Sequence, residues 1–135
     1  MMSRCKEMSL TAAVAEIADG SKVVLGHGAV TPNCVVEELV RQCDRFKQLQ
    51  IFHLIYLGEA VHLVPGMEQH MRVCSPFLSG AAMRNAVREG RADFIPRHFS
   101  QVPMLFAERG AFQPDWAVVQ VTPPDAEGRY SAKDS

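Results

Sequence analysis

A run of apolar residues near the middle of the chain restricts the fold more than any other feature of the sequence. Residues 50–56 include Ile51, Phe52, Leu54 and Ile55, with little of the alternation that a half-exposed strand shows. A strand that is buried on both faces has such a near-continuous apolar run, and strands of this kind occur in parallel sheets covered by helices. The run therefore predicts an α/β protein with parallel strands.

Strand-forming and helix-forming segments alternate on both sides of this run. Short strands are predicted at 22–25, 71–78, 92–95 and 116–121, and helices at 10–18, 33–43, 81–89 and 100–109. Ser9 and Ser100 are the expected N-caps of the first and last helices, and a turn at 125–128 precedes a segment, 129–131, where a further strand could begin. Because parallel strands need right-handed crossovers, this alternation predicts one open, largely parallel sheet with helices on its faces, in a single domain over residues 1–135.

The composition argues against several classes of protein. Charged residues make up 21% of the chain, apolar residues 47%, and the formal net charge is −1, which disfavours intrinsic disorder and a surface for nucleic acid. No apolar run approaches the roughly 20 residues of a membrane span, and the first six residues lack the apolar stretch of a secretory signal. We expect a soluble, cytoplasmic protein whose four cysteines are reduced and mostly packed inside.

The sharpest local feature is the turn Gly26-His27-Gly28, which follows the strand predicted at 22–25. Glycines after a strand let the backbone approach a ligand, and Pro32 marks the start of a helix whose first amides can hold an anion. His27 could donate to a carboxylate or thioester carbonyl, act as a base, or bond only to backbone. A tight turn without a ligand is the other interpretation, because no third glycine of a dinucleotide fold and no Gly-Lys-Ser/Thr ending of a P-loop is present.

The other chemistry-bearing residues favour structural roles. His62, Glu68 and His70 lie in one loop region, but their spacing fits no usual zinc pattern, so no metal site is predicted. No cysteine stands at a glycine-framed turn and no Gly-x-Ser-x-Gly string occurs, which disfavours a cysteine or serine nucleophile. The string Glu-Gly-Arg-Ala-Asp at 89–93 is typical of a helix C-cap glycine with locally paired charges.

Several strings taken together resemble a known family. The most distinctive are Glu-Gly-Arg-Ala-Asp-Phe-Ile-Pro at 89–96, Phe-Ser-Gln-Val-Pro at 99–103 and Gln-Val-Thr-Pro-Pro-Asp at 120–125. With Val-Val-Leu-Gly-His-Gly at 23–28, Pro32 and shorter matches further on, the chain resembles the amino-terminal part of the acetyl-CoA hydrolase/transferase family, which includes 4-hydroxybutyrate CoA-transferases. The resemblance covers roughly residues 9 to 131. One departure is Ala-Lys-Asp-Ser after Ser131, where family members continue with a Ser-Leu-Gly-type strand.

The resemblance implies an activity and a place for the site. Members of this family move CoA between carboxylic acids through a glutamate of a carboxy-terminal domain, which forms acyl-anhydride and glutamyl-CoA intermediates. The motifs of that domain are absent from these residues, so the sequence assigns no catalytic residue here. Five glutamates do not match the position of that nucleophile: Glu37, Glu38, Glu59, Glu68 and Glu89.

The same resemblance implies which residues contact the substrate. The loop Gly26-His27-Gly28 with Pro32 is expected to line the acyl or carboxylate side of the cleft, with Ser100 as a second choice. Coenzyme A or acyl-CoA is implied as a substrate of the complete enzyme, together with a short carboxylate, and no covalently bound cofactor is expected.

Three functional interpretations stay open. The first is an amino-terminal or truncated CoA-transferase domain, inactive alone, that works with a carboxy-terminal half or a partner subunit on acetate, butyrate or 4-hydroxybutyrate, by transfer or by thioester hydrolysis. The second is a stand-alone, non-catalytic module that binds acyl-CoA, a carboxylate or another protein, and that covers an exposed apolar patch by forming a homo-oligomer. The third is an unrelated small hydrolase that uses His27 with a nearby acid.

Overall fold

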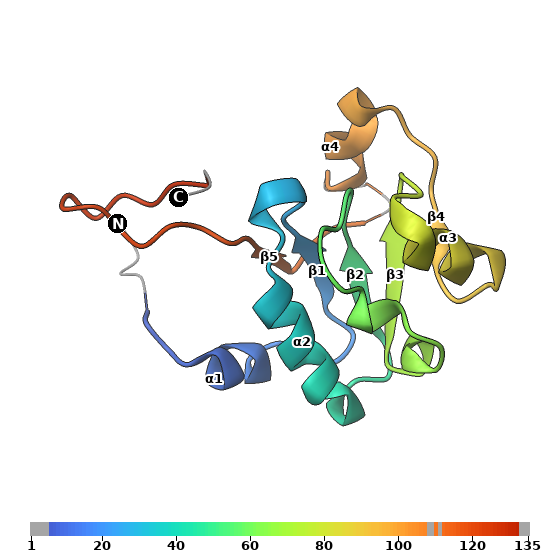
Figure 1. Ribbon diagram of the computed structural model, residues 1–135, viewed down its shortest axis with the longest axis horizontal. Helices are drawn as coiled ribbons and strands as arrows, with labels where there is room; N and C mark the ends of the chain where they lie inside the picture. The colour runs from blue at the N-terminus through green and yellow to red at the C-terminus, as the bar shows by residue number, and fades with distance from the viewer. Residues whose placement is uncertain (1–5, 108–109, 111, 133–135) are drawn as a thin grey trace.

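The computed structural model describes residues 6–107, 110 and 112–132. Five parallel strands form one open sheet in the order β4-β3-β2-β1-β5, as Figure 1 shows. The strands are β1 (Lys22–Leu25), β2 (Leu49–Phe52), β3 (Met71–Ser75), β4 (Asp93–Phe94) and β5 (Trp116–Val118). The α-helices are α1 (Leu10–Ala15), α2 (Asn33–Arg41), α3 (Gly80–Arg88) and α4 (Val102–Leu105). Five 3₁₀ turns complete the described structure: η1 (Gly28–Val30), η2 (Cys43–Arg45), η3 (Val61–Leu63), η4 (Met67–Gln69) and η5 (Phe99–Gln101). The predicted open parallel α/β sheet is therefore confirmed.

The central strand β2 contributes to two cores, as its apolar run predicts. Ile51 lies in register with Val23 of β1 and Val73 of β3. Ile51 packs into the larger core, to which α1, α2 and α3 contribute, whereas Phe52 packs into a second core with residues of α4. Burying a large apolar side chain contributes roughly 1.5–3 kcal/mol to stability. A one-residue slip of β2 would turn Ile51 and Phe52 to the opposite faces of the sheet, and the contribution of each side chain to its core would be lost.

Several strands end earlier than the sequence predicts, each for a local reason. β3 stops at Ser75 because Pro76 has no amide proton with which to extend the ladder. β2 stops at Phe52, and the chain turns so that the Ile55 carbonyl accepts a hydrogen bond from the glycine loop instead of a neighbouring strand. β5 stops at Val118, after which the Gln120 amide donates to the loop that follows β1.

The two predicted helix caps have opposite outcomes. Ser9 caps α1, since its Oγ accepts from the Ala12 amide at 3.2 Å. Ser100 caps no helix but lies inside η5, whose N-cap is His98. The helix predicted at 100–109 is wrong over most of its length, because the Leu105 carbonyl accepts from the Phe112 amide at 2.8 Å rather than from a further helical turn. Residues 108 and 109 lie outside the described part of the chain.

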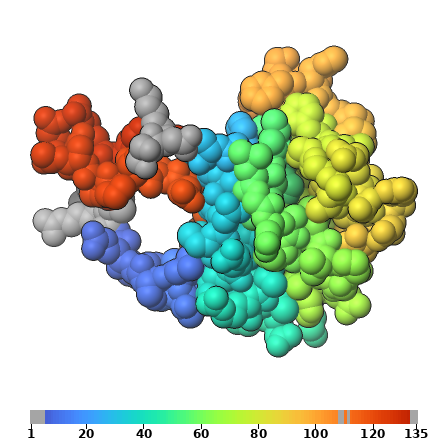
Figure 2. All heavy atoms as spheres, viewed as in Figure 1, coloured from blue at the N-terminus to red at the C-terminus, as the bar shows by residue number. Residues whose placement is uncertain are grey.

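The C-terminal tail folds back on itself beyond β5. The Asp125–Gly128 turn is closed by the Gly128 amide, which donates to the Asp125 carbonyl at 2.9 Å, as predicted. The Thr122 amide donates to the Ser131 carbonyl at 2.8 Å, so the segment predicted as a strand pairs with the tail itself and not with the described sheet. Figure 2 shows the tail, in red, and α1, in blue, extending from the same side of the domain.

Candidate functional site

The order of the strands reverses at one point, between β1 and β5. The chain passes from β1 through β2 and β3 to β4, and β5 then returns to the other side of β1. In open α/β sheets, ligands bind beyond the carboxyl ends of the strands at such a reversal, because the two flanking loops diverge and leave a crevice. The loop Gly26-His27-Gly28 follows β1 at this point, and its Gly26 amide donates to the Val118 carbonyl of β5 at 2.7 Å.

The two glycines of this loop are required by the backbone geometry. A Cβ atom on Gly26 would lie 2.5 Å from the carbonyl oxygen of Val30, which no ordinary side chain tolerates. Gly28 has a φ of +60°, and its amide donates to the Ile55 carbonyl at 2.9 Å. Because both glycine amides bond to protein carbonyls, they are not the donors for an anion that a glycine loop can offer. The loop shapes the edge of the sheet instead.

His27 and Pro32 differ in their exposure. His27 is exposed, and its ring meets the ring of Phe99 edge-on, with centroids 6.4 Å apart. Among the described residues no side chain hydrogen-bonds to the His27 ring, so they do not supply the orienting carboxylate that the small-hydrolase interpretation requires. Pro32 is buried, and its carbonyl accepts from the Val36 amide at 3.2 Å in the first turn of α2, so it starts that helix as predicted.

The segment η5 lies against the glycine loop, although it follows that loop by about 70 residues. Phe99 touches the His27 ring and also stacks on Phe77, with centroids 6.4 Å apart and ring planes 17° apart. Ser100 is exposed beside Phe99. The structure therefore places Gly26, His27, Gly28 and η5 at one edge, but Phe99 and not Ser100 makes the contact between the two segments.

An open cavity of about 740 Å³ lies at the same edge. Pro76 and Pro96, which follow β3 and β4, form part of its wall, together with Met104 and Leu105 of the α4 segment. Its polar lining is Arg97, His98 and Gln101. A cationic guanidinium beside an imidazole and an amide can bind a carboxylate or a phosphate. None of these residues is a predicted site residue, although Arg97 and His98 lie just beyond the strand predicted at 92–95, after Pro96.

A pair of buried histidines supports the loop after β2. The Nε2 atoms of His53 and His62 lie 3.0 Å apart, so one ring donates to the other. Burial lowers the pKa of His53 to about 4, and burial together with the neighbouring His53 lowers the pKa of His62 to about 3. The Tyr56 ring lies 4.6 Å from the His62 ring, and burial raises the pKa of Tyr56 to about 12. All three groups are therefore neutral at pH 7.

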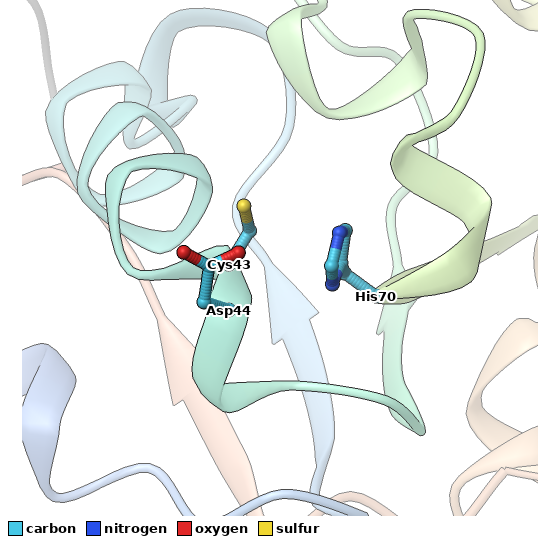
Figure 3. A group of neighbouring side chains, drawn as sticks. All are labelled: Cys43, Asp44 and His70. Atoms are coloured by element: carbon cyan, nitrogen blue, oxygen red, sulfur yellow. The ribbon is translucent and has the colours of Figure 1, made fainter.

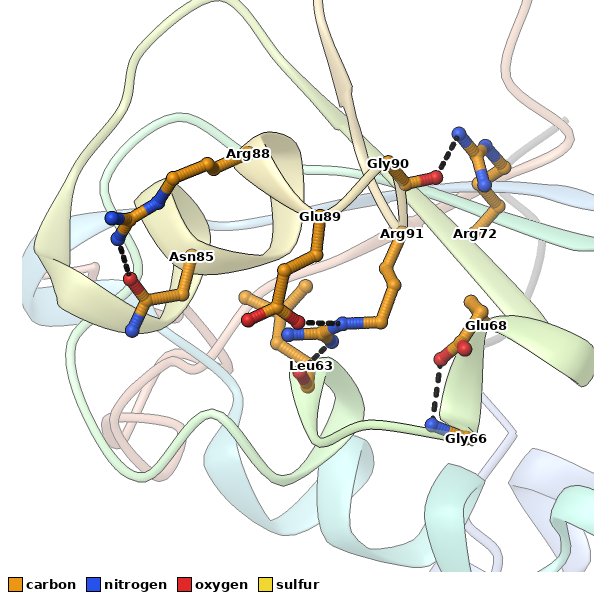
Figure 4. Close-up of polar contacts among 9 residues, drawn as sticks. All are labelled: Leu63, Gly66, Glu68, Arg72, Asn85, Arg88, Glu89, Gly90 and Arg91. Carbon is orange, nitrogen blue, oxygen red and sulfur yellow. Dashed lines mark hydrogen bonds and ion pairs between the residues drawn. The ribbon is translucent and has the colours of Figure 1, made fainter.

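The charged string at 89–93 is structural, as predicted. The Glu89 carboxylate accepts from Arg91 Nε at 2.8 Å, and Arg91 also donates to the Leu63 carbonyl at 2.6 Å, which ties the end of α3 to η3 (Figure 4). Arg72 donates to both carboxylate oxygens of Asp93, at 2.7 and 2.8 Å. These residues are committed to one another and are not available to a substrate.

Two of the remaining glutamates are also engaged within the protein. Glu38 is buried, and its carboxylate accepts hydrogen bonds from Arg41 and from Gln42. The Glu68 carboxylate accepts from the Gly66 amide at 2.7 Å, as Figure 4 shows. Glu37 in α2 and Glu59 in the loop after β2 differ, because both are exposed and no ion pair holds either of them among the described residues.

His62, Glu68 and His70, whose spacing predicts no metal site, each bond to a different partner. His62 pairs with His53, Glu68 binds the Gly66 amide, and His70 Nδ1 lies 3.0 Å from the Phe46 carbonyl.

Cys34, Cys43 and Cys74 are free thiols. The prediction of interior packing holds for Cys74, whose burial raises its thiol pKa to about 11. It is wrong for Cys34, which is exposed in the first turn of α2, and Cys43 is half-buried in η2.

The single parallel sheet with helices on its faces and a strand-order reversal beside a glycine loop defines an open α/β domain. The family model of the acetyl-CoA hydrolase/transferase N-terminal domain matches residues 4–133. The chain therefore belongs to the acetyl-CoA hydrolase/transferase family, and the resemblance inferred from its strings is confirmed.

Curated and solved relatives agree with this assignment. The chain is 38% identical to a 4-hydroxybutyrate coenzyme A transferase of Clostridium kluyveri over 93% of its own length and 29% of the relative's. It is 36% identical to a succinyl-CoA:acetate/propanoyl-CoA:succinate CoA transferase of Fasciola hepatica over 83% of this chain and 23% of that one. The crystal structure of a 4-hydroxybutyrate CoA-transferase from Porphyromonas gingivalis is 33% identical with a TM-score of 0.65, over 90% of this chain and 26% of that chain.

A further solved structure supports the fold alone. RipA from Yersinia pestis superposes with a TM-score of 0.79 at 24% identity, over 93% of this chain and 31% of RipA. The chain thus spans less than a third of the length of each of these relatives.

Proposed function

We propose that this domain forms one wall of the substrate cleft of a CoA-transferase that moves CoA between short-chain carboxylic acids. The observation that carries the proposal is the 740 Å³ cavity with Arg97 and His98 at the carboxyl edge, beside the glycine loop. Arg97 binds the carboxylate of the acid or a phosphate of CoA, and the loop Gly26-His27-Gly28 borders the acyl group. CoA is a substrate here and not a resident cofactor.

The choice of acid rests on the relatives. Two of them are named as 4-hydroxybutyrate CoA-transferases, and a third acts on succinyl-CoA with acetate. We place 4-hydroxybutyrate first, with acetate and butyrate as the other acids to compare, and transfer ahead of thioester hydrolysis. A cytoplasmic location is part of the proposal, while the structure itself contributes only that no helix in its described part could cross a bilayer.

Catalysis, on this proposal, needs residues beyond these 135, which a carboxy-terminal half or a partner subunit supplies. Glu38 is buried with both carboxylate oxygens hydrogen-bonded, and one carboxylate oxygen of Glu68 and of Glu89 is bonded to a neighbouring group, which favours structural roles for these three glutamates. The outer edge of β5 also supports the need for a further part. A groove of about 300 Å³ runs between α1 and β5, and its apolar lining includes Leu10, Ile17 and Val119.

The experiment is an assay of the purified 135-residue chain for CoA exchange between acetyl-CoA and the three acids, with thioester hydrolysis followed in parallel. The expected result is no turnover, together with weak acyl-CoA binding in a calorimetric titration that Arg97→Ala reduces about tenfold. Arg129→Ala, which removes an exposed arginine of the tail, is the matched control and should leave binding unchanged. Turnover would overturn the proposal that the nucleophile lies elsewhere, and Glu59→Gln would then be the first variant to assay.

A second candidate function is a non-catalytic module that self-associates. Exposed apolar residues just after β5 favour it, because Val119 and Val121 are 55% and 41% exposed. Sedimentation of the chain over a range of concentrations distinguishes the two functions. A dimer that Val119→Asp dissociates would support the module, whereas a monomer at all concentrations would support a domain that docks onto further parts of an enzyme.

A further inference from the structure

Three metal-binding side chains converge at the amino edge of the sheet, opposite the candidate substrate cleft. Cys43 and Asp44 come from η2, which follows α2, and His70 directly precedes β3. One possible ligand atom from each residue lies within 4.8 Å of those of the other two. Figure 3 shows Cys43 and Asp44 on one side of a shared space and His70 on the other. Residues that lie 26 positions apart are thus brought together by the packing of η2 against the start of β3.

The three side chains are a chemically consistent set for one kind of cation. A thiolate, an imidazole and a carboxylate together suit zinc or a similar borderline divalent metal, and disfavour magnesium and calcium, which take oxygen ligands. Bond lengths of about 2.0–2.3 Å in a tetrahedral zinc site place the donor atoms roughly 3.3–3.6 Å apart. The donor atoms of the three residues lie within 4.8 Å of one another, at most about 1.5 Å beyond this spacing, so a metal needs only small side-chain rotations to bring them to bonding distance.

The hydrogen bond of His70 prepares its ring for a metal. A carbonyl oxygen only accepts, so the Phe46 carbonyl at 3.0 Å requires the proton to be on Nδ1. This fixes the neutral tautomer and leaves the lone pair on Nε2. Metal-bound histidines commonly donate their other ring N–H to a backbone carbonyl in this way.

The charges around the cluster also favour a cation. A thiol loses its proton when it binds a metal, so Cys43 and the carboxylate of Asp44 can together supply negative charge to a cation. No described lysine or arginine forms an ion pair with Asp44. The nearest cation in sequence, Arg45, is directed elsewhere, since its Nη2 donates to the carbonyls of Val14 and Ile17. Asp44 is exposed, so water has access as a fourth ligand.

We propose that Cys43, Asp44 and His70 form a zinc-type site that clamps η2 to the start of β3. The role is structural, because the glycine loop and the 740 Å³ cavity lie at the carboxyl ends of the strands and this cluster lies before the amino end of β3. This proposal does not rest on the proposed CoA-transferase function, and its test is separate from the test of that function.

The experiment is a titration of the reduced chain with Co²⁺ as a visible probe, followed by displacement with Zn²⁺. The expected result is one equivalent of Co²⁺ with tetrahedral d–d bands and a thiolate charge-transfer band, all abolished in Cys43→Ser and at least tenfold weaker in His70→Ala. Cys34→Ser is the matched control, because Cys34 is an exposed thiol on the preceding helix and outside the cluster. It should retain the full signal.

Thermal unfolding gives a second readout that does not depend on colour. Saturating Zn²⁺ should raise the Tm of the parent chain by about 5 °C or more, and should leave the Tm of Cys43→Ser unchanged. Far-ultraviolet circular dichroism of each metal-free variant confirms that it folds. The proposal is overturned if no Co²⁺ binds at millimolar concentration, if Cys34→Ser loses the signal, or if the site survives Cys43→Ser and disappears in His53→Gln, which would assign it to the buried histidine pair.

Discussion

The amino and carboxyl edges of the sheet differ in how completely their polar groups are hydrogen-bonded. At the amino edge, side chains satisfy the turns: Asp19 accepts from the amides of Lys47 and Gln48, both at 2.9 Å, and His70 bonds to the Phe46 carbonyl. In the segments that follow β1 and β2 at the other edge, buried polar atoms lack partners. Among the described residues these atoms are Asn33 Oδ1, His53 Nδ1, Tyr56 OH and His62 Nδ1.

The difference suits an amino edge that stabilises the fold and a carboxyl edge that carries the candidate site. Buried polar groups are normally satisfied, and leaving one without a partner costs roughly 1–3 kcal/mol. Proteins keep unsatisfied buried polar groups mainly at functional sites. The atoms without partners belong to residues near the loop after β2, in which the Ile55 carbonyl accepts a hydrogen bond from the Gly28 amide. The amino edge has the opposite character, with its turns closed by paired groups.

The largest expected effect comes from acid acting on the buried histidine pair. The folded-state pKa values of His53 and His62, about 4 and about 3, lie below the ordinary histidine pKa of 6.5, so the unfolded chain binds protons first as the pH falls. The free energy of unfolding should therefore decrease between pH 6.5 and pH 4.5, by roughly 1.4 kcal/mol per pH unit for each histidine. Urea unfolding at several pH values measures this slope.

The double variant His53→Gln/His62→Gln tests the assignment, and His27→Gln is the exposed control. The double variant should flatten the slope over this pH range, whereas the control should retain it. An unchanged slope in the double variant would show that other groups cause the acid sensitivity.

A smaller effect is expected from the glycine loop. Gly26→Ala places a Cβ atom 2.5 Å from the Val30 carbonyl oxygen in a buried turn, and overpacking of this kind costs about 3 kcal/mol. At the amino edge Gly20→Ala meets nothing within 4 Å, and its φ of +84° costs only about 1–2 kcal/mol. Urea midpoints of the two variants compare the edges directly. Equal losses would mean that the turn at Gly26 relaxes and does not constrain the site.

The smallest expected effect is at the amino edge. Asp19→Ala removes the acceptor of two backbone amides, so the urea midpoint at pH 7 should fall by less than in Gly26→Ala. The amides of Gln48 and Lys47 hold the pKa of Asp19 below its usual value, so this contribution is present at neutral pH and is lost as the pH falls through that lowered pKa. Asp125→Ala removes the equivalent acceptor in the tail and should not change the midpoint. A loss in the tail variant equal to that in Asp19→Ala would contradict this account.

The sequence predicts the framework well because side-chain patterns carry local information. The limits of β1 and the cap of α1 follow from residues adjacent in the chain, and both are confirmed. The ends of β2 and β5 were wrong because they depend on hydrogen bonds from Gly28 and Gln120 to segments distant in sequence.

Site residues are predictable from the sequence only where the signal is local. The glycine loop can be predicted from the sequence because glycines after a strand mark positions where the backbone turns tightly. The cavity around Arg97 is lined by residues that follow β3 and β4 and by residues of η5 and α4, so no single string encodes it. The string at 99–103 points to Ser100, whereas the neighbouring Phe99 makes the contact with the loop.

The late return of β5 has a consequence for how the chain folds during synthesis. Of the strands that the structure describes, β5 leaves the ribosome last and pairs with β1, and the Lys22 amide donates to the Asp115 carboxylate, 93 positions later in the chain. The four strands from β1 to β4 pair in sequential order and can assemble while the remainder is still being made. Until residue 118 emerges, the open side of β1 remains an unpaired template, and this interval is when the nascent protein is most exposed to aggregation.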